Sequence, residues 1–258
     1  DTHIMAMVKA ASYGGGSFEI ASVLQYQKVS YLAVAYTDEG VELRKAGIRM
    51  PIMVMNPEPA SFDLMIENFL EPEIYSFSVL SSFIRSLEAK LPYNSPPYPV
   101  HIEVDTGMHR LGFDTGKISS LISLLNSTRS LKVASVFSHL ATADDKSNTE
   151  FAVRQITLFK IIRQQFLDEL TEARPLFHIL NSAGIINFPD AQFDMVRPGI
   201  GLYGIANDPV VQEKLRNVGT LKSVISQIKR VNKGESVGYN RAFIAPEDIT
   251  IAIVAIGY

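Results

Sequence analysis

Eight short apolar runs recur along most of this chain, and longer amphipathic segments separate them. Such an alternation is the pattern of repeated βα units wound around a parallel sheet. Because eight is the number of parallel strands that closes a (β/α)8 barrel, the pattern predicts an α/β fold of the TIM-barrel type. The runs lie near residues 3–8, 31–35, 52–55, 73–75, 100–104, 132–137, 177–180 and 195–196.

The segments between the runs fit the outer helices of such a barrel. A helix is predicted to begin near Ser17, and residues 150–167 carry apolar side chains at helical spacing. Residues 92–99 contain four prolines, which cannot continue a helix. We therefore predict that this segment is a connector that leads to the fifth strand.

The pattern changes after the eighth run. Residues 221–231 and 249–256 are predicted to be extended, with a turn at residues 232–235. We expect residues 1–215 to form the barrel and residues 216–258 to form the beginning of a β-rich second domain. Because the last apolar run is typical of a strand in mid-domain, we expect this second domain to be truncated.

The charge balance and the absence of cysteine restrict the possible functions. With 24 basic and 27 acidic residues the net charge is -3, which gives no electrostatic case for nucleic acid, so a small molecule is the expected partner. The lack of cysteine excludes disulfides, thiolate metal sites and a cysteine nucleophile, and no metal site is predicted. No apolar run approaches the length of a membrane span, so we expect no membrane contact and a cytoplasmic location.

Lys9 leaves the first apolar run and enters a loop that contains Gly14, Gly15 and Gly16. Burial disfavours the ammonium form of a lysine and lowers its pKa, which leaves a neutral amine able to condense with a carbonyl. Lys9 is therefore the first candidate for a Schiff base. The alternative is a lysine whose stem lies along the strand end while its ammonium group stays in water.

The loops after the seventh and eighth runs suit an anion. In (β/α)8 barrels these two loops often hold a phosphate, and here they contain Ser182 and the pair Gly199 and Gly201. Taken alone, Ser182 could cap the next helix and the glycines could form a tight turn. Taken together with Lys9, a phosphate site opposite a Schiff-base lysine fits pyridoxal phosphate.

Five segments form motifs in a fixed order: residues 8–14 (VKAASYG), 105–112 (DTGMHRLG), 138–144 (SHLATAD), 181–183 (NSA) and 195–200 (MVRPGI). In this order they resemble the alanine racemase family, and the match spans nearly the whole chain. The resemblance implies a barrel that binds pyridoxal 5'-phosphate and interconverts L- and D-alanine, supplying D-alanine for peptidoglycan. It also implies a homodimer with shared active sites.

The resemblance implies two acid/base residues. Lys9 would hold the cofactor as a Schiff base and act at the substrate Cα, and Tyr239, from the second domain of the partner subunit, would act from the opposite face. An unperturbed tyrosine pKa of ~10 is high for this work, so cationic neighbours must help. The family supplies them through His139 and Arg197, each of which could instead be an ordinary capped or ion-paired residue at a strand end.

Further contacts follow from the same resemblance. Arg197 would lie against the pyridine nitrogen, where a permanent cation disfavours ring protonation. Arg110 would contact the cofactor's phenolic oxygen and the substrate carboxylate, and Met108 would line the substrate pocket. The implied phosphate contacts are Tyr13, Ser182, Gly199 and Ile200, with Asn181 as a supporting residue.

Two positions depart from the family pattern. Glu103 stands where many members have a lysine whose carbamylated form presents an anion to the arginine. Because glutamate already carries that charge, we predict that Glu103 pairs directly with Arg110 and that no lysine carbamate forms. Ala11 and Gly15 replace the usual asparagine and histidine of the first loop, and cofactor binding is expected to survive this change.

Three alternatives to a racemase remain at this stage. A non-catalytic barrel that binds pyridoxal phosphate would lack the segment containing Tyr239. A pyridoxal-phosphate-dependent amino-acid decarboxylase commonly uses a cysteine of the second domain as its proton donor, and this chain has none. The third alternative is a barrel without a cofactor.

Overall fold

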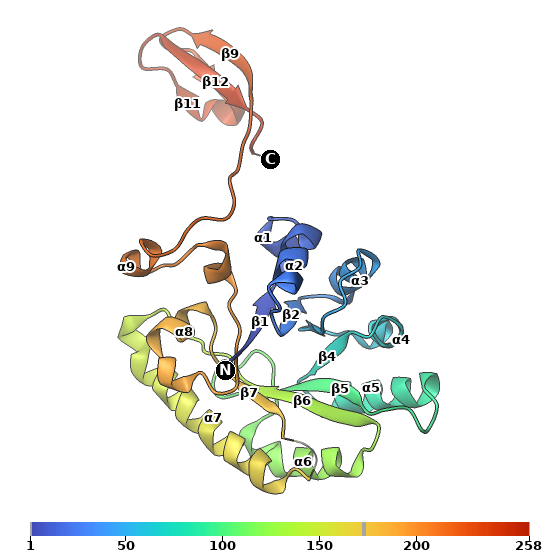
Figure 1. Cartoon of the computed structure of the whole chain (residues 1–258). Coiled ribbons are helices and arrows are strands. Elements are labelled where there is room, and N and C mark those ends of the chain that lie inside the picture. Colours follow the sequence, from blue (N-terminus) through green and yellow to red (C-terminus); the bar gives the residue numbers. More distant parts are fainter. Residues whose placement is uncertain (1, 172–173, 258) are drawn as a thin grey trace. The chain divides into compact units, whose positions relative to one another are not determined.

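A computed structural model describes residues 2–171 and 174–257 (Figure 1). The chain divides into two compact units, residues 1–217 and residues 218–258. Among the described residues, no helix is both long enough and apolar enough to span a membrane.

The first unit is built on a sheet of eight parallel strands that alternate with helices (Figure 1). Neighbours in the sheet follow chain order from β7 to β1, and β8 pairs with β1. Hydrogen bonds from Asp194 N to Phe177 O (3.0 Å) and from Arg197 N to Leu180 O (2.9 Å) join β7 to β8. The predicted (β/α)8 fold is therefore confirmed. The strands are β1 (His3–Met7), β2 (Tyr31–Val34), β3 (Ile52–Val54), β4 (Glu71–Ile74), β5 (Tyr98–Glu103), β6 (Leu131–Phe137), β7 (Leu176–His178) and β8 (Met195–Val196).

Amphipathic helices pack on the strands because each buries one apolar face. In α7 (Thr149–Glu169), Phe159 and Phe166 are buried, in agreement with the helix predicted there. At the start of α5, Ser76 Oγ accepts a hydrogen bond from Val79 N (3.3 Å), the usual role of a serine N-cap. The other helices are α1 (Lys9–Tyr13), α2 (Ser17–Tyr26), α3 (Thr37–Lys45), α4 (Phe62–Glu67), α5 (Phe77–Lys90), α6 (Ile118–Ser127), α8 (Ser182–Asn187) and α9 (Pro209–Gln212).

The sequence pattern located most boundaries to within a few residues. The helix predicted near Ser17 begins at that residue, and the proline-rich connector ends where β5 begins at Tyr98. The fourth strand starts at Glu71 rather than at Glu73. An apolar pattern does not detect this strand, because its sequence is Glu-Pro-Glu-Ile. Pro72 and both glutamates are nevertheless buried in the folded chain.

Side chains along each barrel strand alternate between two environments. One set packs with the helices in the main core, as Ala6, Leu32 and Ile102 do. The other set points into the barrel and differs around its circumference. From β8 through β1 to β3, the inward residues form a second apolar cluster, which we call the methionine side: Met5, Met7, Ala33, Met53 and Met195. From β4 to β7 and just after β8, the inward residues form what we call the polar side: Glu71, Glu73, His101, Glu103, Ser135, His178 and Arg197, all buried.

The second unit consists of two antiparallel strand pairs. The strand β9 (Ile225–Val231) pairs with β12 (Ile249–Val254), and β10 (Ser236–Val237) pairs with β11 (Phe243–Ile244). The predicted turn at residues 232–235 follows β9, and Asn232 N donates to Glu235 Oε2 (2.7 Å) within it. This unit is the β-rich segment predicted to follow the barrel.

Candidate active site

A cavity of about 620 Å³ opens among the loops that follow the barrel strands. In (β/α)8 barrels this carboxyl-terminal face carries the active site. Loops that are far apart in the sequence meet there, because parallel strands bring all their carboxyl ends to one face. Of the residues named from the sequence, those in the cavity wall are Lys9, Tyr13, Arg110, His139, Asn181, Ser182, Arg197, Gly199, Ile200 and Gly201.

Lys9 lies two residues after the end of β1, half-buried in the cavity wall. The next residues adopt a left-handed turn, with φ of 52° at Ala10 and 56° at Tyr13. Each non-glycine residue in this conformation costs about 1–2 kcal/mol, so the turn needs external support. Glu39 supplies it, since Oε1 accepts from Ala10 N (2.6 Å) and Oε2 from Ala35 N (2.7 Å), which ties the turn to the end of β2.

Tyr13 presents its hydroxyl group beside Gly199. Its ring packs against Tyr203 with centroids 4.8 Å apart, and Tyr203 donates to Met7 O (2.8 Å). A Cβ atom on Gly199 would lie 2.9 Å from Tyr13 Oη, so a glycine leaves room for this hydroxyl. Burial raises the pKa of Tyr13, and the hydroxyl therefore keeps its proton and can donate at neutral pH.

Ser182 lies between the N–H groups of two glycines. Its Oγ accepts from Gly199 N (2.8 Å) and Gly201 N (3.2 Å), which leaves its own hydrogen available. In the described part of the chain, the N–H of Ile200 also has no acceptor. Together with the hydroxyl of Tyr13, these groups offer three donors on one wall of the cavity, an arrangement that suits a phosphate.

Asn181, and not Ser182, caps the helix that follows β7. The Oδ1 atom of Asn181 accepts from Gly184 N (2.9 Å), and its Nδ2 lies 3.4 Å from Leu140 O. The alternative in which Ser182 is merely a helix cap is therefore wrong. Asn181 thereby supports the start of α8, where Ser182 is the first residue.

The guanidinium group of Arg197 is held by several acceptors. Its Nη2 donates to Ser138 O (2.7 Å) and lies 3.4 Å from His139 Nδ1, while its Nη1 contacts His178 Nδ1. The group also lies over the ring of Phe137, 4.9 Å from the centroid. Among the described residues no acceptor faces its Nε–H. One donor of a buried arginine that lines the cavity is thus free for a ligand.

Arg197 remains a cation in spite of its burial. Burial lowers its pKa to about 10, while the charges of Glu103 and Glu73 oppose this shift. At neutral pH the guanidinium therefore stays protonated and can only donate.

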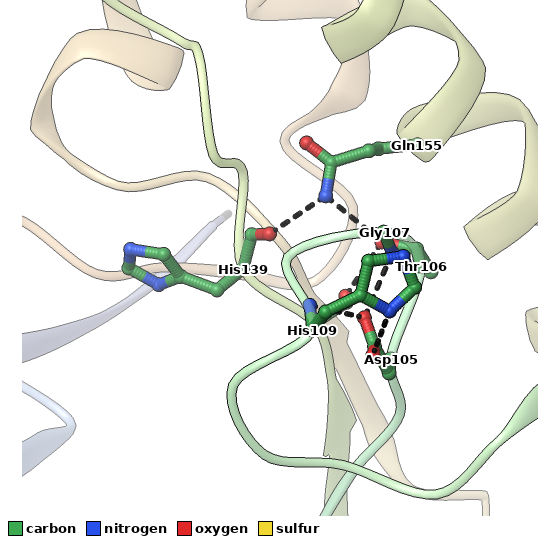
Figure 2. A network of polar contacts seen from close by, with 7 residues as sticks. Asp105, Thr106, Gly107, His109, His139 and Gln155 are labelled. Atoms are coloured by element: carbon green, nitrogen blue, oxygen red, sulfur yellow. Dashed lines mark hydrogen bonds and ion pairs between the residues drawn. The ribbon is translucent and has the colours of Figure 1, made fainter.

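Figure 2 shows how His139 is oriented: its carbonyl oxygen points toward Gln155 and its imidazole points away from it. Gln155 Nε2 donates to His139 O (3.0 Å) and to Thr106 Oγ1 (3.4 Å), and its Oε1 accepts from Ala141 N (2.9 Å). The loops after β5 and β6 are thereby tied to α7. Burial, with the charge of Arg197 adding to it, lowers the pKa of His139 to about 3, so its imidazole is neutral and can accept.

Asp105 shapes the loop after β5 (Figure 2). Its Oδ1 accepts from Gly107 N (2.8 Å) and His109 N (3.2 Å), and its Oδ2 lies 3.0 Å from His109 Nδ1. Burial alone would raise the pKa of Asp105, but these groups outweigh it and hold the pKa below its usual range. Arg110 follows in the cavity wall, whereas Met108 of the same loop does not line the cavity.

The predicted direct ion pair between Glu103 and Arg110 is wrong, because no Arg110 nitrogen lies within 4.0 Å of a Glu103 oxygen. Glu103 is buried in β5, while Arg110 is exposed beyond the Asp105 turn. Glu103 instead lies close enough to Glu73 of β4 for the two carboxyl groups to influence one another. Burial, and next the charge of Glu103, raise the pKa of Glu73 well above its usual range.

Tyr239 lies in the second unit, on the short turn Tyr239–Arg241. Its side chain is 96% exposed, and within the described residues its hydroxyl has no hydrogen-bond partner. The intrachain contacts of this tyrosine are therefore few.

Three residues that organise the cavity were not singled out from the sequence. His178 lies in the seventh apolar run, where a lone histidine indicates an inward polar role. Gln155 occupies a core position of an amphipathic helix, which is also a readable signal. Glu39 carries no comparable signal, because nothing in the chain reveals that the start of α3 meets Ala10.

Comparison with known proteins gives one consistent result. The family model described as alanine racemase, N-terminal domain, matches residues 1–207, and that of the C-terminal domain matches residues 218–258. The alanine racemase of Helicobacter pylori (strain P12) is 34% identical over 271 residues, covering 100% of this chain and 70% of the relative. A serine/alanine racemase of Enterococcus gallinarum is 35% identical over 266 residues, covering 100% of this chain and 36% of that protein. The solved alanine racemase of Clostridium difficile 630 superposes with a TM-score of 0.86 at 33% identity, covering 100% of this chain and 67% of that one.

Proposed function

The chain belongs to the alanine racemase family, and from this premise we propose that it interconverts L- and D-alanine with pyridoxal 5'-phosphate as its cofactor. The observation that carries the proposal is the make-up of the cavity wall. An amine, Lys9, and three phosphate-binding donors line one cavity of about 620 Å³. The supply of D-alanine for peptidoglycan, in the cytoplasm, is part of the same proposal.

The residues present fit the cofactor. Tyr13 Oη–H, Ser182 Oγ–H and Ile200 N–H would hold the phosphate. Glycines 199 and 201 leave room for the side chains of Tyr13 and Ser182, since a Cβ at Gly201 would lie 3.2 Å from Ser182 Cβ. The free Nε–H of Arg197 would meet the ring nitrogen. When bound, the cofactor supplies an aldehyde that joins an amine and a conjugated ring that spreads negative charge.

Racemisation requires a proton to leave Cα on one face and another to arrive on the opposite face. We propose Lys9 for one face, because its amine lines the cavity. Tyr239 of a second copy of the chain is proposed for the other face, which makes the active enzyme a homodimer. The high exposure of Tyr239 supports this role, since its side chain is free to contact another chain.

His139 and Arg197 would assist that tyrosine and hold the ring. His139 is neutral and accepts from Arg197, so its remaining ring nitrogen can carry a hydrogen toward the tyrosine oxygen. Arg197 keeps its charge and cannot give up its proton to the ring nitrogen. Arg110, as a planar fork in the cavity wall, is the proposed partner of the substrate carboxylate.

Two measurements test the proposal. Protein loaded with pyridoxal phosphate and reduced with borohydride is expected to carry the cofactor on Lys9, and Lys9→Ala to carry none. Loss of optical rotation from L-alanine without release of carbon dioxide would support a racemase over a decarboxylase. If the dimer binds the cofactor but neither racemises nor decarboxylates L-alanine, it is a non-catalytic protein that binds pyridoxal phosphate. If it binds no cofactor, the proposal is rejected. A parallel assay with L-serine distinguishes the substrate range of the two kinds of relative.

A further inference from the structure

A continuous hydrogen-bonded chain crosses the polar side of the barrel and ends at the cavity. His101 Nε2 lies 2.8 Å from Glu71 Oε2, and His101 Nδ1 lies 2.7 Å from Ser135 Oγ. Ser135 Oγ lies 2.9 Å from His178 Nε2, and His178 Nδ1 contacts Arg197 Nη1. The strands β4, β5, β6 and β7 contribute one member each, and Arg197 is the member that lines the cavity.

All hydrogen bonds of this network point the same way, from donor to acceptor, starting at Arg197 and ending at Glu71. The reason is that an arginine side chain has donors and no acceptor. His178 must accept at Nδ1, so its hydrogen is on Nε2, which donates to Ser135. Ser135 has a single hydrogen and gives it to His101 Nδ1. His101 therefore carries its hydrogen on Nε2 and donates to the carboxylate of Glu71.

The opposite direction leaves groups unpaired. A hydrogen on His178 Nδ1 would face a donor of Arg197. A hydrogen on His101 Nδ1 would give Ser135 two incoming donors and no acceptor for its own hydrogen, since Ser135 Oγ has no other partner in the described residues. His101, Ser135 and His178 are all 0% exposed, and an unpaired polar group costs most where water is excluded.

The packing around the two histidines prevents their rings from turning over freely. Phe137 stacks on His178 with centroids 5.0 Å apart and planes 3° from parallel. Tyr31 lies edge-on to His101 at 5.5 Å. Burial, with the charge of Arg197 adding to it, holds the pKa of His178 well below its usual range, which agrees with a neutral ring that accepts from arginine.

We propose that Glu71, His101 and Ser135 are positioning residues. Through His178 they hold the guanidinium of Arg197 so that its Nη1 is hydrogen-bonded to His178 and its Nε–H stays available for the bound ligand. That this ligand is the ring nitrogen of pyridoxal phosphate rests on the proposed function. The direction of the chain does not depend on the cofactor, so it can be tested in the protein without it.

The first test determines the tautomers of the two histidines in the wild-type protein. Nitrogen-15 NMR of ring-labelled histidines distinguishes protonated from non-protonated ring nitrogens in the cofactor-free dimer, and His101→Gln and His178→Gln assign the signals. Both histidines are expected to carry their hydrogen on Nε2. A hydrogen on Nδ1 of either ring overturns the proposal.

The second test changes Glu71, the residue of the hydrogen-bonded network that lies farthest from Arg197. Glu71→Leu removes the last acceptor, while Glu71→Gln keeps a carbonyl oxygen there and is the matched control. In Glu71→Leu we expect His178 to become a mixture of tautomers. We also expect the affinity for pyridoxal phosphate to fall about 10-fold, by analogy with the loss of metal affinity when the partner of a metal-ligating histidine is removed. Glu71→Gln is expected to keep both properties. A folded Glu71→Leu with the wild-type His178 tautomer and affinity overturns the proposal.

The third test asks whether the effect passes through Ser135. In a Ser135→Ala background, Glu71→Leu is expected to alter the signals of His101 and to leave His178 as it is in Ser135→Ala alone. An equal change of His178 in both backgrounds would indicate general loosening and overturn the proposal.

A further pair of variants covers the case in which Glu71→Leu does not fold. Ser135→Thr keeps the hydroxyl and Ser135→Ala removes it, so the alanine variant alone should shift the Nε2 signal of His178. Identical spectra for the two variants overturn the proposal. Wild-type protein that binds no pyridoxal phosphate rejects the proposed function, while the tautomer measurements still decide the role of these residues.

Discussion

The methionine side and the polar side both fill the barrel interior, but the first is held together by apolar packing and the second by hydrogen bonds. On the methionine side, Met5, Met7 and Met53 fill the space with flexible apolar chains. On the polar side, a chain of hydrogen bonds from Glu71 to Arg197 joins inward residues of neighbouring strands, while Glu73 and Glu103 each keep one buried oxygen without a partner in the described residues. Both sides are buried, so the difference lies in chemistry and not in exposure.

The comparison teaches where the barrel tolerates change. Methionine adapts its shape, so each contact on the methionine side can be replaced by another apolar contact. A polar group in a water-free interior depends on its particular partner, and the loss of one partner leaves the next one unpaired. The polar side is therefore cooperative, and it reaches the cavity through Arg197, whereas the methionine side reaches it through Met7.

The strongest way to break this comparison is His178→Leu. The variant removes the donor to Ser135 Oγ and the side-chain acceptor of Arg197 Nη1, so we expect the free energy of unfolding to fall by about 3 kcal/mol. Urea denaturation measures this change, and Met53→Leu is the matched control on the methionine side. Losses of equal size in the two variants would mean that the two sides do not differ.

Phe137 belongs to both sides, since it packs in the methionine cluster and stacks on His178 and Arg197. We expect Phe137→Leu to lower the free energy of unfolding by about 1–2 kcal/mol through the lost ring contacts. It should also weaken the binding of pyridoxal phosphate. Phe177→Leu, in the helix-facing core, should lose stability without this effect on binding, and the same binding loss in both variants would count against a special role for Phe137.

The difference in stability between wild type and Glu73→Gln, a variant of the polar side, is expected to depend on pH. The pKa of Glu73 is raised in the folded chain by burial, so below its unfolded pKa of ~4.5 both states hold the proton and nothing is lost. As pH rises above that value, the unfolded state releases its proton first and wild-type stability falls. Glu73→Gln removes this effect, so its thermal midpoint should match wild type near about pH 4 and exceed it near about pH 8. A constant offset at all pH values would contradict the prediction.

The smallest change is expected from Met53→Leu considered alone. A swap of similar volume in an apolar cluster should cost less than about 1.5 kcal/mol in free energy of unfolding. The affinity for pyridoxal phosphate should be unaffected. A cost above that range, measured by the same urea titrations, would show that the methionine side is as specific as the polar side.

The fold was predictable because eight apolar runs with β-strand spacing are a strong local signal. Lys9, Ser182, Gly199 and Arg197 were also within reach of sequence reasoning, since each follows directly after a predicted strand and barrel sites gather there. The strand at Glu71 began earlier than predicted because buried glutamates resemble surface residues until a partner is known. The ion pair predicted for Glu103 failed for the same reason, since the group that its charge affects, Glu73, lies on the neighbouring strand.

By itself the sequence determined the number of strands, the face on which the loops meet and the residue types available there. All three follow from periodicity and chain order, which are local properties. Only the tertiary structure decided which buried polar groups face one another, and so which way the hydrogens run from Arg197 to Glu71. The physical reason is that a hydrogen bond depends on the distance and direction between two atoms, and residues from different strands acquire these only when the barrel closes.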